Sequence, residues 1–212
     1  MTGQESCRNP RFARAYLRVA EQADLRGGAE HRRRLLEGLR GRVLEVGAGQ
    51  GRNFPHYPGT VTEVVAVEPE ETLRSFARRA AERAPVPVTV RAGHAGELPA
   101  EPETFDAVVF SLVLCTVDDP RAALAEAARV LRPGGQLRFY EHVRSTRRWA
   151  ALLEDAVTPL WRRAAGGCHP NRDTPATVRA AGFTVEDVDR FGFSPAPLAP
   201  PLAHVLGRAT RR

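Results

Sequence analysis

Three glycines follow a short apolar segment and could form a loop that binds a small ligand. Residues 43–46 are mostly apolar and predict a β-strand, and Gly47, Gly49 and Gly51 stand at alternate positions directly after it. Because glycine has no Cβ and accepts a positive φ, such a loop brings the backbone close to a ligand. Glu45 precedes the glycines, and its carboxylate would repel a phosphate but would suit an ammonium group. The segment therefore favours a ligand with a cationic amine.

The same loop departs from the dinucleotide-binding pattern. The motif Gly-x-Gly-x-x-Gly/Ala needs a small sixth residue, which lets the following helix pack against the strand below a pyrophosphate. Arg52 stands at that position and is too large. This argues against a dinucleotide. Taken alone, the glycines could also form an ordinary tight turn between a strand and a helix.

A second acid lies one strand further along the chain. Glu68 ends the apolar run 64–67. In nucleotide-binding α/β folds, an acid at the end of the second strand accepts hydrogen bonds from the ribose hydroxyls. Two acids and three glycines on consecutive strand–helix units therefore predict a nucleoside that has a charged amino-acid tail and no phosphate, which is S-adenosylmethionine.

Alternating strand and helix patterns must position these residues. Such alternation predicts a mostly parallel sheet with right-handed crossovers, with the ligand at the carboxyl ends of its strands. We expect one α/β domain over residues 1–212, with a helical lid over 1–40, a cofactor-binding core over 41–143 and substrate-side elements over 144–212. The expected strands cover 43–46, 62–68, 86–91, 105–110, 136–143, 184–191 and 204–209, and the expected helices cover 11–25, 29–39, 70–83, 120–131, 147–165 and 174–181.

Composition excludes several classes of protein. All 31 basic residues are arginine and the net charge is +6, but the runs 32–34 and 147–148 have no interleaved aromatic residues that could stack on bases. We therefore interpret them as solvated helix faces and expect no nucleic-acid partner. No apolar run approaches the ~18 residues of a membrane span, and residues 1–10 lack the apolar region of a signal peptide.

The cysteines indicate a reducing, cytoplasmic location. They are Cys7, Cys115 and Cys168, an odd number without CxxC spacing. On this pattern we expect no metal site. The sequence leaves the oligomeric state open.

Four motifs in the core resemble those of the class I S-adenosylmethionine-dependent methyltransferases. Their order and spacing match that family from about residue 40 to residue 143. The resemblance implies a Rossmann-like fold with a mostly parallel seven-stranded sheet, flanking helices and an N-terminal helical lid. The motifs are Glu45-Val-Gly-Ala-Gly-Gln-Gly51, Glu68-Pro69, Phe105-Asp106-Ala-Val-Val109 and Arg129-Val-Leu-Arg-Pro-Gly-Gly135.

Further motifs are similar to those of the mammalian methyltransferase-like thiol S-methyltransferases, over roughly residues 30 to 209. They are residues 112–117, Glu141-His142-Val143, Pro159-x-Trp161, Gly167-Cys168-x-x-x-Arg172-Asp173-Thr174 and 203–207.

The chain departs from these relatives in two ways. Many of them have a His-rich pair where it has Cys115-Thr116, and the mammalian enzymes have an N-terminal membrane helix that we do not find in it. We therefore expect a soluble bacterial relative that methylates a small thiol. The alternatives are an N-, O- or C-methyltransferase of another metabolite, such as a quinone or a phospholipid amine, and a non-catalytic module that binds S-adenosylmethionine or RNA.

The resemblance also implies roles for individual residues on the cofactor side. Glu45 would hold the methionine ammonium, directly or through water, and Glu68 would bind the ribose. His94 could instead be a plain loop histidine, and Tyr16, the expected lid residue, could belong to the core. The full cofactor set is Tyr16, Glu45, Gly47, Gly49, Glu68, Pro69, His94, Ala95, Ser111 and Leu112.

The acceptor side needs few chemical groups. Methyl transfer from a sulfonium is an in-line displacement that depends on alignment, and a thiol becomes a good acceptor as its thiolate. His142 is the expected base and Arg172 the expected cation, although His142 could simply hold a loop and Arg172 could form a structural salt bridge. Cys115, Trp161 and Phe191 are the expected substrate contacts, with core packing as the alternative for the two aromatic residues.

Overall fold

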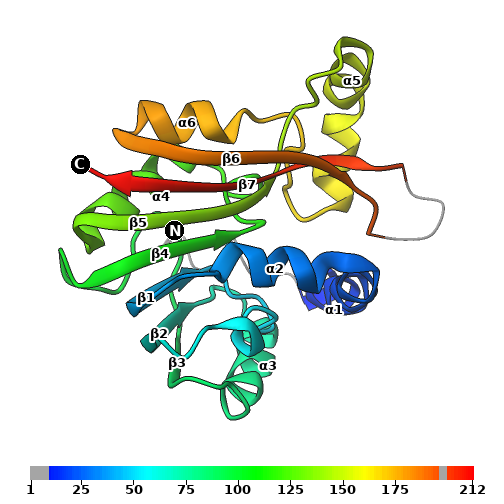
Figure 1. Ribbon diagram of the computed structural model, residues 1–212. Helices are drawn as coiled ribbons and strands as arrows, with labels where there is room; N and C mark the ends of the chain where they lie inside the picture. The colour runs from blue at the N-terminus through cyan, green and yellow to red at the C-terminus, as the bar shows by residue number, and fades with distance from the viewer. Residues whose placement is uncertain (1–9, 196–199) are drawn as a thin grey trace.

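Seven strands form one sheet in the computed structural model, which describes residues 10–195 and 200–212 (Figure 1). The strand order is β3-β2-β1-β4-β5-β7-β6, and only β7 runs antiparallel to its neighbours. This confirms the Rossmann-like sheet expected from the sequence. The strands are β1 Gly41–Val46, β2 Val61–Val67, β3 Val88–Arg91, β4 Phe105–Ser111, β5 Leu131–His142, β6 Phe183–Phe193 and β7 Leu202–Arg211.

Helices cover both faces of this sheet. α2 and α3 contribute buried side chains to the core on one face, and α4 and α6 contribute to the core on the other. Two layers of helix explain why residues 64–67 of β2 and 107–110 of β4 are apolar without interruption. The helices are α1 Pro10–Ala23, the π-helical turn η1 Asp24–Gly28, α2 Ala29–Leu36, the short 3-10 helix η2 Phe54–His56, α3 Glu71–Ala81, α4 Pro120–Val130, α5 Arg148–Ala164 and α6 Thr174–Ala180.

Local sequence signals set the starts of these helices. Asp119 accepts hydrogen bonds from the first backbone N–H groups of α4, and Pro120 occupies its first position, where proline costs no hydrogen bond. Asp173 caps α6 and Glu70 caps α3 in the same way. The expected helix over 11–25 ends earlier, at Ala23, and passes through η1 into α2. Strand β5 begins at Leu131, five residues before its expected start, because Leu131 already pairs with Phe105 of β4.

The strand register places the expected site residues along one edge of the sheet. Val46 of β1 lies beside Val67 of β2 and Phe110 of β4, so the loops after these strands emerge together. Figure 1 shows α1 and α5 at the same edge, where the parallel strands end. No helix in the described part of the chain has the length and apolarity to cross a membrane.

Candidate functional site

The glycine loop after β1 lies beneath a tyrosine of α1. Gly47, Gly49 and Gly51 all have positive φ, at +69°, +58° and +82°. A Cβ at Gly47 or Gly51 would collide with neighbouring side chains, whereas at Gly49 it would reach ordinary contact, 3.5 Å from the Tyr16 ring. Two of the glycines therefore serve packing within the protein. At Gly49 the loop backbone faces the Tyr16 ring, and the expected role of Tyr16 as a lid over the cofactor stays a prediction.

Glu45 is buried and held by two donors. It is 1% exposed, Asn53 Nδ2 donates to one oxygen at 2.9 Å and the Tyr57 hydroxyl donates to the other at 2.7 Å. Burial raises the pKa of Glu45 to about 7, against the lowering effect of these two hydrogen bonds. A ligand ammonium would thus interact with Glu45 most easily through Asn53 or through water. Neither Asn53 nor Tyr57 was expected from the sequence.

Glu68 joins the end of β2 to the glycine loop. Its carboxylate accepts the backbone N–H of Gly49 at 2.8 Å and that of Glu70 at 2.9 Å, and the side chain is buried. Burial raises its pKa, although both backbone hydrogen bonds act in the opposite direction. Each oxygen keeps lone-pair capacity for a further donor. The expected contact of Glu68 with ribose hydroxyls is compatible with this arrangement and stays a prediction.

Arg32 is a functional candidate that the sequence analysis missed. It is 6% exposed. Its Nε donates to Asp24 at 3.0 Å, and its Nη1 donates to Asn53 Oδ1 at 3.1 Å and to Ser111 Oγ at 3.2 Å. The interpretation of the run 32–34 as a solvated face is therefore wrong for Arg32. Helical spacing was the available signal, because α2 also buries Leu35 and Leu36 on the face that contains Arg32.

The loop after β4 is fixed by backbone contacts from both sides. Leu112 has a positive φ of +61°, which is uncommon for a residue other than glycine. Fully buried Glu141 accepts the N–H groups of residues 113, 114 and 115 at 2.9–3.0 Å. From the other side, Arg172 Nη1 donates to the carbonyls of Leu114 and Val117, both at 2.6 Å. Arg172 thus positions this loop, and its expected role as a cation beside the acceptor stays a prediction.

Two thiols and an imidazole meet at the carboxyl edge of the sheet. The Sγ atoms of Cys115 and Cys168 are 3.7 Å apart, and His142 Nδ1 lies 3.5 Å from Cys115 Sγ and 3.4 Å from Cys168 Sγ. We call these three residues the thiol–imidazole cluster. Hydrogen bonding from Cys115, and then the nearby His142 and Trp161, lower the pKa of Cys168 to about 4, while burial raises that of Cys115. The pKa of Cys168 is therefore lower than that of Cys115.

The cluster undermines the argument that led us to expect no metal site. The expectation rested on spacing along the sequence, but Cys115 follows β4, His142 ends β5 and Cys168 follows α5. Cysteine thiolate and histidine imidazole are both ligands of thiophilic metals. Beside the cluster, the ring of His204 lies 4.5 Å from that of His142, and burial lowers the pKa of His204 to about 3, so that this ring is neutral.

The remaining expected residues lie in ordinary surroundings. His94 is half-buried and its Nε2 lies 3.7 Å from Glu97, and Ala95 packs into the core. The carbonyl of Pro69 accepts a hydrogen bond from Arg74. Phe191 belongs to an aromatic group and stacks near His204 at a centroid distance of 5.8 Å, so it reaches the cluster only through that histidine. Contacts of these four residues with a ligand stay predictions.

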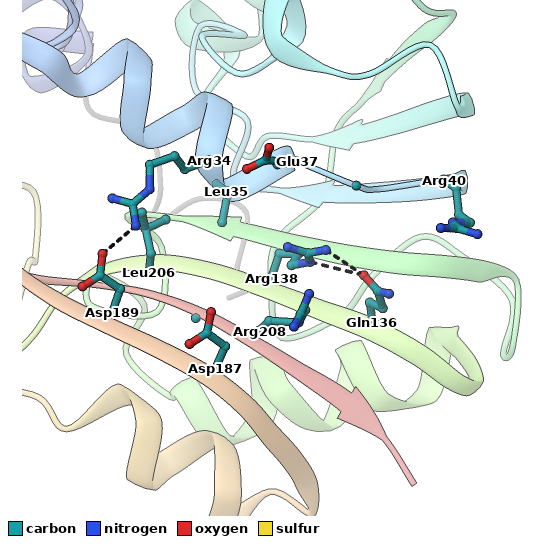
Figure 2. A pocket seen from close by; sticks show the side chains of 12 residues that line it. Arg34, Leu35, Glu37, Arg40, Gln136, Arg138, Asp187, Asp189, Leu206 and Arg208 are labelled. Carbon is teal, nitrogen blue, oxygen red and sulfur yellow. Dashed lines mark hydrogen bonds and ion pairs between the residues drawn. The ribbon is translucent and has the colours of Figure 1, made fainter.

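A polar hollow of about 470 Å³ lies away from this edge, between the end of α2 and strands β5 to β7 (Figure 2). Figure 2 shows that Arg34 pairs with Asp189, at 2.6 Å, and that Arg138 donates to Gln136. Because ligands of such sheets bind at the carboxyl ends of the strands, this hollow is not the candidate site.

Comparison with known proteins identifies the core. A model described as a methyltransferase domain matches residues 44–139. Thiol S-methyltransferase TMT1B of Rattus norvegicus is 34% identical over 176 residues, covering 80% of this chain and 70% of its own. Ubiquinone biosynthesis O-methyltransferase of Rhizobium etli is also 34% identical, over 187 residues, covering 85% and 74%.

A solved structure shares the fold. It is a methyltransferase of Thermotoga maritima, described as a possible histamine N-methyltransferase, with a TM-score of 0.71 and 25% identity, and the likeness covers 95% of this chain and 97% of that one.

Proposed function

Since the chain belongs to the class I S-adenosylmethionine-dependent methyltransferases, we propose that it transfers the methyl group to the sulfur of a small-molecule thiol. The similarity to a thiol S-methyltransferase extends over 176 residues, whereas the methyltransferase model ends at residue 139. That similarity therefore includes elements outside the cofactor core. Identity alone does not separate a thiol from a phenol as acceptor, because an O-methyltransferase matches at the same 34%.

The observation that carries the proposal is the thiol–imidazole cluster. Two sulfur atoms and an imidazole nitrogen lie within 3.7 Å of one another. They meet at the end of β5 and beside the loop after β4, at the carboxyl edge of the sheet, where this fold binds its substrates. Thiols and imidazole are polarizable groups, and a polarizable surrounding suits a sulfur acceptor better than an oxygen acceptor. Trp161, which is half-buried and whose Nε1 has no hydrogen-bond partner among the described residues, would add an apolar wall for the substrate carbon chain.

The cofactor side fits S-adenosylmethionine by the chemistry of its groups. Glu68 offers carboxylate oxygens to the ribose, and Asn53, which also contacts Glu45 and Arg32, can take part in binding the methionine end. When bound, the cofactor supplies an electrophilic methyl group on a positively charged sulfur. The protein's task is to align this methyl with the acceptor and to exclude water, and alignment alone is worth roughly 7–11 kcal/mol in favourable cases.

The acceptor must reach the methyl group as a thiolate. A free thiol has a pKa of about 8.5 and is only a few per cent ionised near neutrality. We propose that His142, whose Nδ1 already faces two thiols, promotes this ionisation in the bound complex. Arg172 would act indirectly, because it holds the carbonyls of the loop that contains Cys115.

A panel of acceptors tests the assignment. The purified protein is incubated with methyl-tritiated S-adenosylmethionine and, in parallel, with alkyl thiols, aromatic thiols, phenols, a demethylated quinol and amines of matched size. We expect methylated thiols and one S-adenosylhomocysteine for each methyl transferred. Turnover of a phenol, quinol or amine without turnover of any thiol would refute S-methylation and leave the family assignment intact.

A further inference from the structure

We propose that Cys115, His142 and Cys168 bind a zinc ion and leave one position on that ion open for the sulfur of the acceptor thiol. The metal site itself depends only on the geometry of these three side chains. The occupant of the open position rests on the function proposed above.

The distances within the cluster are those of three corners of a zinc tetrahedron. With Zn–S near 2.3 Å and Zn–N near 2.0–2.1 Å, tetrahedral geometry requires about 3.8 Å between two sulfur ligands and about 3.5 Å between sulfur and nitrogen. The observed separations are 3.7 Å between the two Sγ atoms, and 3.5 Å and 3.4 Å from these atoms to His142 Nδ1. A zinc ion could therefore bind without any large movement of the three ligand atoms.

Three different parts of the fold hold the ligands in place. Cys115 lies in the loop fixed by Glu141 and Arg172, and its carbonyl accepts the N–H of His169 at 2.6 Å. This last bond ties the loop of Cys115 directly to the segment of Cys168. Fixed ligands favour metal binding because little conformational entropy is lost when the ion enters.

Close backbone packing brings the two loops together at Gly167, directly before Cys168. Gly167 has a φ of +91°, and a Cβ there would lie 3.3 Å from the carbonyl oxygen of Thr116. A larger residue would therefore be strained at this position and would push the two loops apart. The approach of Cys168 to Cys115 is thus built into the backbone.

The charge and number of the ligands indicate a reactive zinc site. Two thiolates and a neutral imidazole balance the charge of Zn²⁺. In the described part of the chain these three side chains form one group, with their ligand atoms within 4.8 Å of one another. Structural zinc sites usually have four protein ligands, whereas catalytic sites have three and an open position. The half-buried His142, beside two buried cysteines, marks the more accessible side of the cluster.

An open position on zinc would solve the ionisation problem of the acceptor. A thiol that coordinates zinc loses its proton, here to solvent, because a metal-bound thiol is deprotonated at neutral pH. Its sulfur then attacks the methyl carbon of S-adenosylmethionine. A sulfur–carbon bond forms, the bond from the methyl to the sulfonium breaks, and the electron pair stays on S-adenosylhomocysteine. The thioether product is a poor zinc ligand and leaves. In this form His142 acts as a ligand.

Cobalt is the probe for the metal site itself. The full-length protein is reduced, stripped with a chelator and titrated with Co²⁺. We expect one equivalent to bind, with the visible absorption of tetrahedral cobalt and a thiolate-to-cobalt charge-transfer band in the near ultraviolet, and we expect Zn²⁺ to abolish both. Failure of the reduced protein to give these bands would overturn the proposal without the use of any variant.

Variants locate the ligands. Cys115→Ser, Cys168→Ser and His142→Ala should each weaken zinc binding by more than the roughly 10–100-fold that loss of a supporting residue causes. Cys7→Ser and His56→Gln are matched controls that should bind zinc as the unmodified chain does. Unchanged S-adenosylmethionine affinity verifies that each variant is folded. Zinc affinity that survives both cysteine substitutions, or that falls equally in the controls, would refute the assignment.

The role of the open position is tested separately. An added alkyl thiol should strengthen the charge-transfer band of the cobalt protein, because a third sulfur joins the metal, and a phenol of the same size should not. The metal-free protein should methylate the thiol at least tenfold more slowly. Equal rates with and without metal would overturn the acceptor role. A normal cobalt site in a protein that methylates no thiol would instead refute the proposed function and leave the metal site standing.

Discussion

Replacing Glu45 by glutamine should make the protein more stable at alkaline pH. The pKa of Glu45 is raised from 4.5 to about 7 in the folded state, chiefly by burial. An acid whose pKa is raised on folding leaves the free energy of unfolding unchanged at pH values below its unfolded pKa. As the pH rises from the unfolded pKa through the folded pKa, the free energy of unfolding falls. Glu45 therefore destabilises the folded state increasingly between about pH 4.5 and pH 7, and fully above pH 7.

The size of the effect follows from the shift. The difference between 4.5 and about 7 is about 2.5 pKa units, and at 1.36 kcal/mol per unit this amounts to about 3 kcal/mol. Glutamine fits the same space and can keep both neighbours. Its oxygen accepts from Asn53 Nδ2, and its NH₂ donates to the Tyr57 hydroxyl, which then becomes the acceptor. Glu45→Gln should thus match the unmodified protein near pH 4.5 and exceed its free energy of unfolding by about 3 kcal/mol at pH 8.

Urea unfolding of both proteins from pH 4.5 to pH 8, without cofactor, measures this difference. The same variant should bind S-adenosylmethionine more weakly if the charge of Glu45 serves the ammonium group, while adenosine should bind as before. Parallel stability curves over the whole pH range would show that the carboxylate is ionised at little cost and would refute the reasoning. Equal losses for both ligands would assign Glu45 to the fold.

Three further substitutions test the site. Glu68→Ala should weaken S-adenosylmethionine binding by about 1.5–3 kcal/mol, the value of hydrogen bonds to a charged group. This corresponds to a loss of affinity of roughly tenfold or more, and unchanged affinity in calorimetry would exclude the ribose contact. His142→Ala should slow methylation of an alkyl thiol by roughly 10²-fold or more. It should slow methylation of an acidic thiol much less, because the acidic thiol is already ionised when it binds. Equal slowing of both thiols would reduce His142 to a positioning residue. Arg172→Ala should slow both thiols equally, since its guanidinium holds backbone carbonyls, and slowing confined to the alkyl thiol would instead indicate that its charge acts on the acceptor.

Local patterns in the sequence were sufficient to predict the strands, most of the helices and the edge of the sheet at which Glu68 and the glycine loop meet. Glu68 and the glycine loop lie where the strand–helix alternation placed them, because the carboxyl ends of neighbouring parallel strands must meet. The partners of Glu45 could not be predicted in the same way. Asn53 and Tyr57 lie in an irregular segment around a short 3-10 helix, and no periodicity directs their side chains to a strand.

The thiol–imidazole cluster depends on tertiary structure alone. Cys115 and Cys168 are separated by α4, β5 and α5, so their distance along the chain contains no information about their distance in space. Arg32 was missed for a different reason. Its neighbours Arg33 and Arg34 are exposed, as the charge of the run suggested, but the helix turns Arg32 by about 100° relative to Arg33 and so into the protein.

One short loop connects the cofactor side of the site with the acceptor side. It begins after Ser111, which accepts a hydrogen bond from Arg32, and it reaches the cluster at Cys115. Leu112 is held at a positive φ, a conformation of order 1–3 kcal/mol above a relaxed one. Glu141 offsets this strain by binding three N–H groups of the loop.

Such rigidity suits methyl transfer, which needs donor and acceptor atoms about 3–3.5 Å apart and in line. A loop fixed through its backbone holds the acceptor side at a constant distance from the cofactor side. Only the side chain at the tip of the loop then needs to change for a different acceptor. Cys115 lies on that loop, with its Sγ 3.5 Å from His142 Nδ1. A change of this side chain would alter the acceptor side and leave in place the backbone N–H groups that Glu141 binds.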